Sequence, residues 1–348
     1  MLERNDMYDV TIESAAVWED KIYAVGRDAG VLFCFDMKTN FVEKILRMPD
    51  EDVLVNRLYN GVCVDKECLV LVPFNAKKIW YYNIKSKEWN SIEIDYYVKP
   101  KLEGKFVGGV LQNSILYLFG YRYKNVLCVN LITKEVQKMF EDGQHSFWGQ
   151  SIVIDNNKVY AIDLGRNEIL SINLTCQGKY EIIKVNGLPE AKENSNQGIA
   201  FDGTFFYIIK HHGNYVYKWR PNESALPIEI DHFYDKIEPF FNGGAVYGEK
   251  LFLYSPKGKN YILDLEENRN SCMIDKKIFG VKTMEELGLI LCKKGKVSIL
   301  NKKMKEIGCL ETVLNCQEHS ALYNSAKVQG KLLTENELFR LHDFLVSI

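Results

Sequence analysis

Three features of the sequence predict an all-β fold built from seven similar units. A small residue opens an apolar segment in each unit, and successive copies lie 37 to 47 residues apart, at Ser14, Gly61, Gly108, Ser151, Gly198, Gly243 and Gly280. A second apolar segment begins eight residues after each small residue. The 20 Tyr and 18 Phe residues favour strands. Units of roughly 40–50 residues that hold four short strands predict a β-propeller of about seven four-stranded blades.

The third unit displays the predicted elements most clearly. A first strand opens at Gly108, a second covers Ile115–Phe119 and stops at Gly120, a third ends on Asn130, and a fourth lies near Val136–Phe140. The third strand ends on Asp or Asn in most units, at Asp36, Asn83, Asn130, Asn173, Asp264 and Asn301, with Trp219 in that place in the fifth. Because such sheets are too small to bury a face alone, neighbouring blades are expected to supply the core.

The two ends of the chain are predicted to differ from the repeats. The last unit is short, so we expect Tyr8–Ile12 to close the ring by pairing with it. The propeller is predicted to cover residues 1–316 and a helical tail residues 317–348. A capping box at 334–337 precedes an apolar stripe of Leu338, Leu341, Leu345 and Ile348. This helix is expected either to pack on the propeller or to dock into a partner.

The second unit carries a family resemblance. Its segment Tyr82–Trp89 resembles the part of a Kelch repeat in which a turn joins the third and fourth strands. The Gly pair that usually ends the second Kelch strand is reduced here to Gly26 and Gly120. The resemblance implies a propeller that holds a protein or a glycan-bearing partner on its loop face.

Composition narrows the function classes. A net charge of −2 argues against a dedicated nucleic-acid binder, and no apolar run approaches the length of a membrane span. The N-terminus has no recognisable secretion signal, so a cytoplasmic location is expected. The nine cysteines are odd in number and irregularly spaced, which favours free, structural thiols over disulfides or zinc ligands. No pattern for a metal or a cofactor is found.

Propeller geometry places two sets of loops on one face. The turns from the second to the third strand and the loops between blades are expected to surround one mouth of the axis, where ligands usually bind. The predicted ligand-binding residues are Arg27, Asn60, Tyr121, Arg122, Trp148, Gln150, Arg166, Gln197, His211 and Asn242. Alternatively, these cations are simply solvated, the aromatic residues cap the seams between blades, and the amides hold water in the channel.

Two functions are compatible with this face. The first is a non-catalytic binding or scaffold propeller that presents an aromatic and basic surface to a protein or a glycan. The second is a lyase or hydrolase that acts on a saccharide or another anionic small molecule, with His145, His211 and Glu13 as candidate catalytic residues. The sequence contains no nucleophile elbow and no phosphate-binding Gly loop, which favours the first function.

Overall fold

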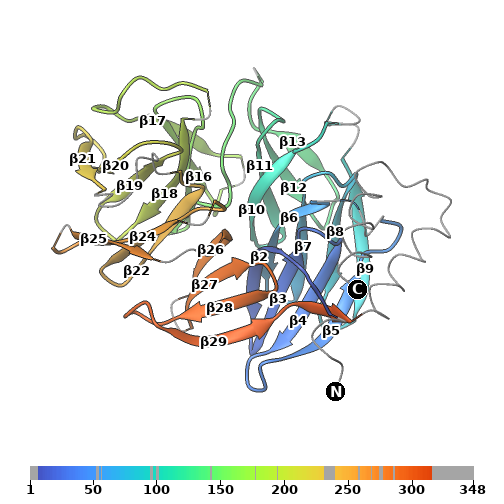
Figure 1. Cartoon of the computed structure of the whole chain (residues 1–348). Coiled ribbons are helices and arrows are strands. Elements are labelled where there is room, and N and C mark those ends of the chain that lie inside the picture. The colour runs from blue at the N-terminus through green and yellow to red at the C-terminus, as the bar shows by residue number, and fades with distance from the viewer. Residues whose placement is uncertain are drawn as a thin grey trace.

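The computed structural model describes residues 7–51, 55, 57–94, 97–98, 102–141, 143–176, 178–193, 195–230, 240–257, 259–267, 269–273, 277–284 and 287–315. The predicted C-terminal helix lies outside these residues. The described part of the chain contains strands and no helix, and so no helical segment that could cross a membrane. The fold is an all-β propeller of seven four-stranded blades (Figure 1).

Each blade is an antiparallel meander whose strands follow the chain from the axis outward. The first three blades comprise β2 (Ile12–Trp18), β3 (Lys21–Gly26), β4 (Val31–Asp36), β5 (Phe41–Arg47); β6 (Tyr59–Asp65), β7 (Cys68–Pro73), β8 (Lys78–Asn83), β9 (Glu88–Glu93); and β10 (Phe106–Gln112), β11 (Ile115–Gly120), β12 (Val126–Asn130), β13 (Val136–Lys138). The fourth and fifth comprise β14 (Val153–Asp155), β15 (Lys158–Ile162), β16 (Glu168–Asn173), β17 (Tyr180–Lys184); and β18 (Asn196–Phe201), β19 (Phe206–Lys210), β20 (Tyr215–Trp219), β21 (Leu226–Glu229). The last two comprise β22 (Gly243–Tyr247), β23 (Lys250–Tyr254), β24 (Asn260–Asp264), β25 (Arg269–Met273); and β26 (Ile278–Met284), β27 (Gly288–Lys293), β28 (Lys296–Leu300), β29 (Glu306–Glu311).

The recurring Asp and Asn residues at the ends of the third strands form the turns that lead into the fourth strands. The Asp36 Oδ1 atom accepts hydrogen bonds from the backbone N–H groups of Lys38 and Thr39, at 2.8 and 3.0 Å. Equivalent bonds are made by Asn83, Asn130, Asn173, Asp264 and Asn301. Trp219 in the fifth blade instead donates from its indole to the Glu223 carbonyl oxygen, at 3.0 Å. The repeated polar residue is therefore a turn-forming device.

The small residues that open the units lie where the innermost strands crowd together. Six of the seven fall within a first strand, and Ser151 lies two residues before β14. At the junction of the last and first blades, a Cβ atom on Gly280 would lie 2.3 Å from the Glu13 carbonyl oxygen. A larger residue cannot fit there without moving the backbone of β2.

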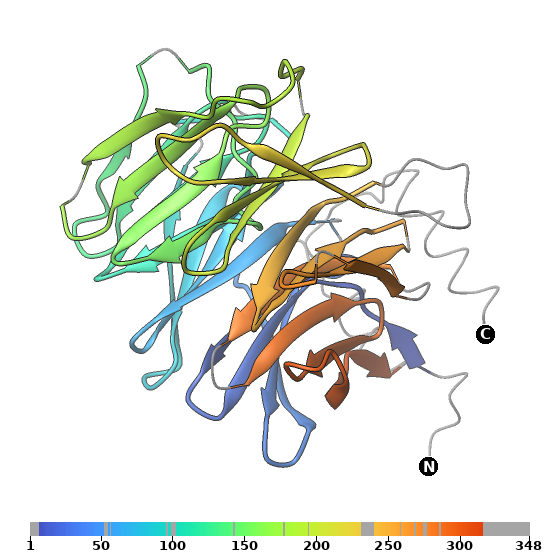
Figure 2. The same cartoon turned by 90° about the vertical axis from the view of Figure 1, so that its left-hand side faces the viewer.

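The ring closes partly as predicted, because Thr11 forms an antiparallel bridge with Lys294 of the seventh blade and the Gly295 N–H donates to the Val10 carbonyl oxygen at 3.0 Å. The seventh blade has four strands of its own, and β1 (Met7–Asp9) pairs with β30 (Val313–Asn315) in a separate two-stranded sheet. Val10 and Thr312 continue this pairing, because the Val10 N–H donates to the Thr312 carbonyl at 2.9 Å and the Thr312 hydroxyl donates back at 3.0 Å. Figures 1 and 2 show the blue first blade beside the orange and red last one.

The core lies between blades. One cluster joins residues of the first blade, such as Ile22 and Phe33, to Ile290 and Val297 of the seventh, all with no exposed surface. Cys34, Cys63, Cys128 and Cys292 are buried, as predicted. Packing between neighbours therefore stabilises both the blades and the closed ring.

Candidate functional site

The axial channel is sealed at one end by a segment that leaves its blade. We call the end with the inter-blade loops and the second-to-third-strand turns the loop end, and the end with the first-to-second-strand turns the hairpin end. In the fourth blade the innermost strand has only three residues, and the preceding segment Trp148–Ser151, here called the plug, extends over the axis at the loop end. A Cβ atom on Gly108, whose φ is 79°, would lie 2.1 Å from the Gly149 carbonyl oxygen.

Side chains of the plug bind blades on both sides of the channel. The Gln150 amide Nε2 donates to Asn60 Oδ1 at 2.6 Å and to the Asn60 carbonyl at 3.0 Å. The Ser151 hydroxyl accepts from the Gly244 N–H at 3.2 Å and donates to its carbonyl at 3.1 Å. The fourth blade is thus tied to the second and the sixth across the axis.

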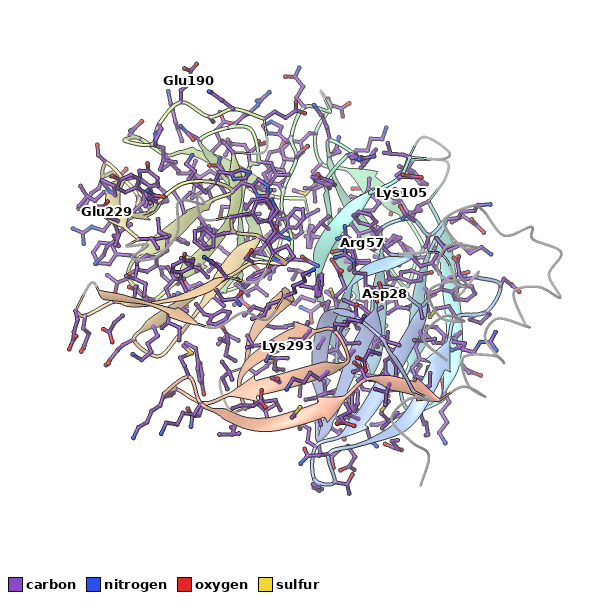
Figure 3. All side chains as sticks on the ribbon, in the orientation of Figure 1. Asp28, Arg57, Lys105, Glu190, Glu229 and Lys293 are labelled. Carbon is purple, nitrogen blue, oxygen red and sulfur yellow. The ribbon has the colours of Figure 1, made fainter. Side chains whose placement is uncertain are left out.

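A buried carboxylate lies beneath the plug. Glu13 is 2% exposed and accepts hydrogen bonds from Arg27 Nη1 at 3.1 Å, from Arg57 Nη2 at 2.6 Å and from Asn60 Nδ2 at 3.0 Å. Gln150 approaches the same carboxylate at 3.4 Å. Two guanidinium groups therefore face one carboxylate. Figure 3 shows Arg57 among the central strands, whereas Glu190 and Glu229 lie at the outer edge of the molecule.

Burial and charge act in opposite directions on the Arg57 guanidinium. Its desolvation lowers the pKa of Arg57, and the negative charge of Glu13 raises it again. The guanidinium carbon also lies 4.1 Å from the centre of the Phe74 ring, and that of Arg27 lies 5.0 Å from the Phe279 ring centre. This cluster is charged, stacked and hydrogen-bonded, and it holds the first two blades and the plug together.

The structure brings together only part of the predicted binding set. Arg27, Asn60 and Gln150 meet in the Glu13 cluster. Trp148 and Gln197 are buried close to the axis, and their Nε1 and Oε1 atoms have no protein hydrogen-bond partner in the described part of the chain. Both atoms are buried, and the Trp148 indole lies beside the Tyr254 hydroxyl.

The remaining predicted residues lie outside the Glu13 cluster, and Tyr121 contacts the plug through the Trp148 ring. Arg166 bonds Gln144 Oε1 at 2.8 Å and lies 3.9 Å from Glu168. Asn242 is partly buried beside Gly243, and its backbone N–H donates to the Tyr254 carbonyl at 2.9 Å. Arg122 is exposed and Tyr121 is half-buried on the neighbouring turn. The loop end is therefore a surface with several separate features rather than a single funnel.

The three candidate catalytic residues are each held by structural contacts. His145 is buried between the Phe140 and Phe147 rings, and its Nδ1 lies 3.0 Å from Asp163 Oδ2. His211 Nδ1 donates to the Phe241 carbonyl oxygen at 3.0 Å, and burial lowers the pKa of His211 to about 4. The third candidate, Glu13, is already paired with two arginines. No group of three metal-ligating side chains occurs in the described residues.

The sequence prediction missed two parts of this region. Arg57, which makes the shortest bond to Glu13, lies in an inter-blade loop, and only its position before Asn60 distinguishes it from solvated cations. The other is a cavity of about 640 Å³ that runs along the axis from Glu13 and the plug toward the hairpin end. The sequence analysis considered only the loops of the loop end and therefore predicted no site toward the hairpin end.

Comparison with known proteins supports the fold alone. No family model and no curated protein matches this chain. Among solved structures, a catalytically inactive virginiamycin B lyase from Staphylococcus aureus with quinupristin aligns with a TM-score of 0.63 and 12% identity, over 89% of this chain and 97% of that one. The Neurospora crassa Pan2 WD40 domain aligns with a TM-score of 0.54 and 10% identity, over 84% of this chain and 94% of the other. The Kelch resemblance stays a prediction.

Proposed function

We propose that this protein is a non-catalytic binding propeller that holds a partner through the Tyr121–Arg122 turn on its loop end. The observation that carries the proposal is the pairing of an exposed guanidinium with a supported aromatic ring. Arg122 is exposed and has no ion-pair partner among the described residues. Tyr121 packs edge-on against Trp148 at 5.6 Å between ring centres.

The turn stands on a rigid base. Tyr121 packs against a buried cluster of Phe74, Val107, Trp148 and Leu164, which comes from three neighbouring blades. The Tyr121 N–H donates to Lys105 O at 2.9 Å, and the Arg122 N–H donates to Gly104 O at 3.1 Å. Tyr and Arg on a preorganised surface are typical anchors of protein interfaces, because little conformational entropy is lost when they bind.

The chemistry of the turn favours a partner with an exposed carboxylate beside an apolar or sugar surface. A guanidinium binds carboxylates through paired N–H donors, and a tyrosine ring packs against side chains or sugar rings. A protein segment and an acidic glycan both fit this description. We favour the protein, since this end carries exposed side chains of both signs: Lys124 lies 3.8 Å from Glu193, and Glu103, Arg122 and Glu141 are exposed on neighbouring loops.

The lyase or hydrolase alternative has one feature in its favour, the His145–Asp163 pair. A histidine oriented by a carboxylate is the arrangement of a general base. Here the imidazole is buried under aromatic rings, and neither residue lines the axial cavity. Likeness to a lyase at 12% identity extends to the fold and not to the chemistry.

The test compares the partners captured from native lysate by the unchanged protein, by Arg122→Glu with Tyr121→Ala, and by Lys138→Glu. Lys138 is an exposed cation on the outer strand of the same blade, so it controls for the charge change. We expect one set of proteins to bind the unchanged protein and the control but not the double variant. The same set on all three proteins would contradict the proposal, and purified glycan competing for that set would identify the glycan as the partner.

A further inference from the structure

The axial cavity is a chamber with one closed and one open end. Glu13 and the plug form its inner wall, and these groups are bonded to one another. Three lining residues at the hairpin end, Ile154, Asp202 and Gly203, are exposed, so the cavity meets solvent there. Its volume of about 640 Å³ lies within the roughly 300–1,000 Å³ range of small-molecule sites.

The wall of this chamber exposes polar and apolar surface in similar amounts. All seven innermost strands or their flanking residues contribute to it, and the aliphatic side chains of the wall that keep exposed surface are Val64, Ile152, Ile154, Ala245, Val246 and Val281. Ile154 is 61% exposed at the mouth. An apolar ligand body would bury this surface.

One cation faces the chamber. Lys282 lies on β26, is exposed, and has no ion pair or hydrogen bond among the described residues. Its ammonium group acts on two buried thiols from different blades. Burial raises the pKa of Cys63 to about 11 and that of Cys292 to about 12, and the Lys282 charge lowers both. Lys282, Cys63 and Cys292 line the same cavity, so the lysine side chain borders the axial space.

The acids of the chamber limit the charge of a ligand. Glu13 is already paired with two arginines at the inner end. Asp202 accepts bonds from the backbone of Thr204 and Phe205 and from the Tyr207 hydroxyl, and Asp155 accepts from Asn156. Both aspartates lie near the mouth, on the fourth and fifth blades, whereas Lys282 lies on the seventh. A ligand with several negative charges would be repelled there.

From these contacts we infer that the axial cavity binds a monoanionic amphiphile, a small carboxylate with an aliphatic body, whose carboxylate pairs with Lys282. The ligand enters from the hairpin end, and its apolar body covers the partly exposed aliphatic side chains of the wall. This site is separate from the Tyr121–Arg122 surface, because the plug and the Glu13 cluster lie between them.

The experiment is calorimetric titration of the full chain with decanoate and with decyltrimethylammonium, both below their micelle-forming concentrations. The two probes share an aliphatic body and differ in the sign of the head group. We expect decanoate to bind with a stoichiometry near one, and the cationic probe to bind at least about tenfold more weakly, because its head group would face Lys282 and gain no ion pair.

Variants of one blade then test the role of the lysine. Lys282→Met should weaken decanoate binding roughly tenfold, and Lys282→Arg should restore most of it. Lys303→Met, at an exposed position in the outer turn of the same blade, should leave the affinity unchanged. Circular dichroism checks that each variant is folded. No decanoate binding, equal binding of both probes, or equal affinities of the Met variants at 282 and 303 would each overturn the inference.

Discussion

The Glu13 cluster gives the sharpest test of how the propeller is held together. Glu13→Gln keeps the size of the side chain and its bonds to Asn60 and Gln150 but removes the charge that faces Arg27 and Arg57. Arg57 has only 19% of its side chain exposed, so its guanidinium would remain desolvated without a counter-charge. Removing one partner of a buried ion pair costs about 3–5 kcal/mol.

The expected loss lies near the lower end of that range. Arg27 is 27% exposed and can regain water, and both guanidinium groups keep their contacts with aromatic rings. We therefore expect Glu13→Gln to lower the free energy of unfolding by about 3 kcal/mol. Glu43→Gln is the matched control, since Glu43 pairs with Lys21 in the same blade but is 35% exposed. A surface pair of this kind contributes about 0–1 kcal/mol.

The measurement is urea unfolding of the three proteins, followed by tryptophan fluorescence and by far-ultraviolet circular dichroism. Coincident transitions from the two signals would justify comparing free energies. A loss of less than about 1 kcal/mol in Glu13→Gln, or a loss equal to that of Glu43→Gln, would refute the view that this ion cluster stabilises the ring.

Two further predictions concern the loop end. Burial lowers the pKa of His211 to about 4. The imidazole is therefore protonated near pH 6.5 in the unfolded chain but only near pH 4 in the folded protein. The free energy of unfolding should therefore fall as the pH drops from 7 to 5, and the His211→Gln variant should lose about 1–2 kcal/mol less than the unchanged protein over that interval. If the free energies of unfolding of the two proteins change in parallel with pH, this prediction is wrong. Gly108→Ala should destabilise the protein by more than about 3 kcal/mol, because its Cβ would overlap the Gly149 carbonyl. Gly165→Ala is the control, because its Cβ would have no heavy atom within 3.5 Å. Equal melting temperatures of the Gly108→Ala and Gly165→Ala variants would contradict the close approach of β10 to the plug.

The fold was predictable because its signals are local and repeated. A turn-forming Asp36 or Asn83 acts on the next two or three residues, and a small residue at a first strand recurs in each unit. Each copy supports the others, so weak patterns add up to a blade count. The contacts that close the ring occur only once in the chain, so no repeated pattern reveals them. The sequence therefore suggested that an N-terminal strand completes the seventh blade, and it gave no sign of the separate pairing of β1 with β30.

The site was less predictable because its contacts are long-range and occur once. Gln150 reaches Asn60, 90 positions away, and Glu13, 137 positions away. The sequence placed Asn60 and Gln150 near the channel mouth because they precede the small residues. It could not show that Gln150 lies in a segment that leaves its blade, because a shortened strand at Val153–Asp155 reads like its longer counterparts.

The plug also separates the two proposed activities in a physical sense. A ligand at the inner end of the axial cavity would contact Glu13 and the plug residues Gly149 to Ser151, whereas Tyr121 contacts the plug through Trp148, which does not line the cavity. Because Gln150 and Ser151 are bonded to blades on opposite sides, a ligand cannot pass between the two ends without breaking those bonds. Binding at one end can then influence the other only by moving the plug. If decanoate changes the set of partners captured by the loop end, binding in the cavity moves the segment Trp148–Ser151. If the set is unchanged, this segment keeps its position when decanoate binds.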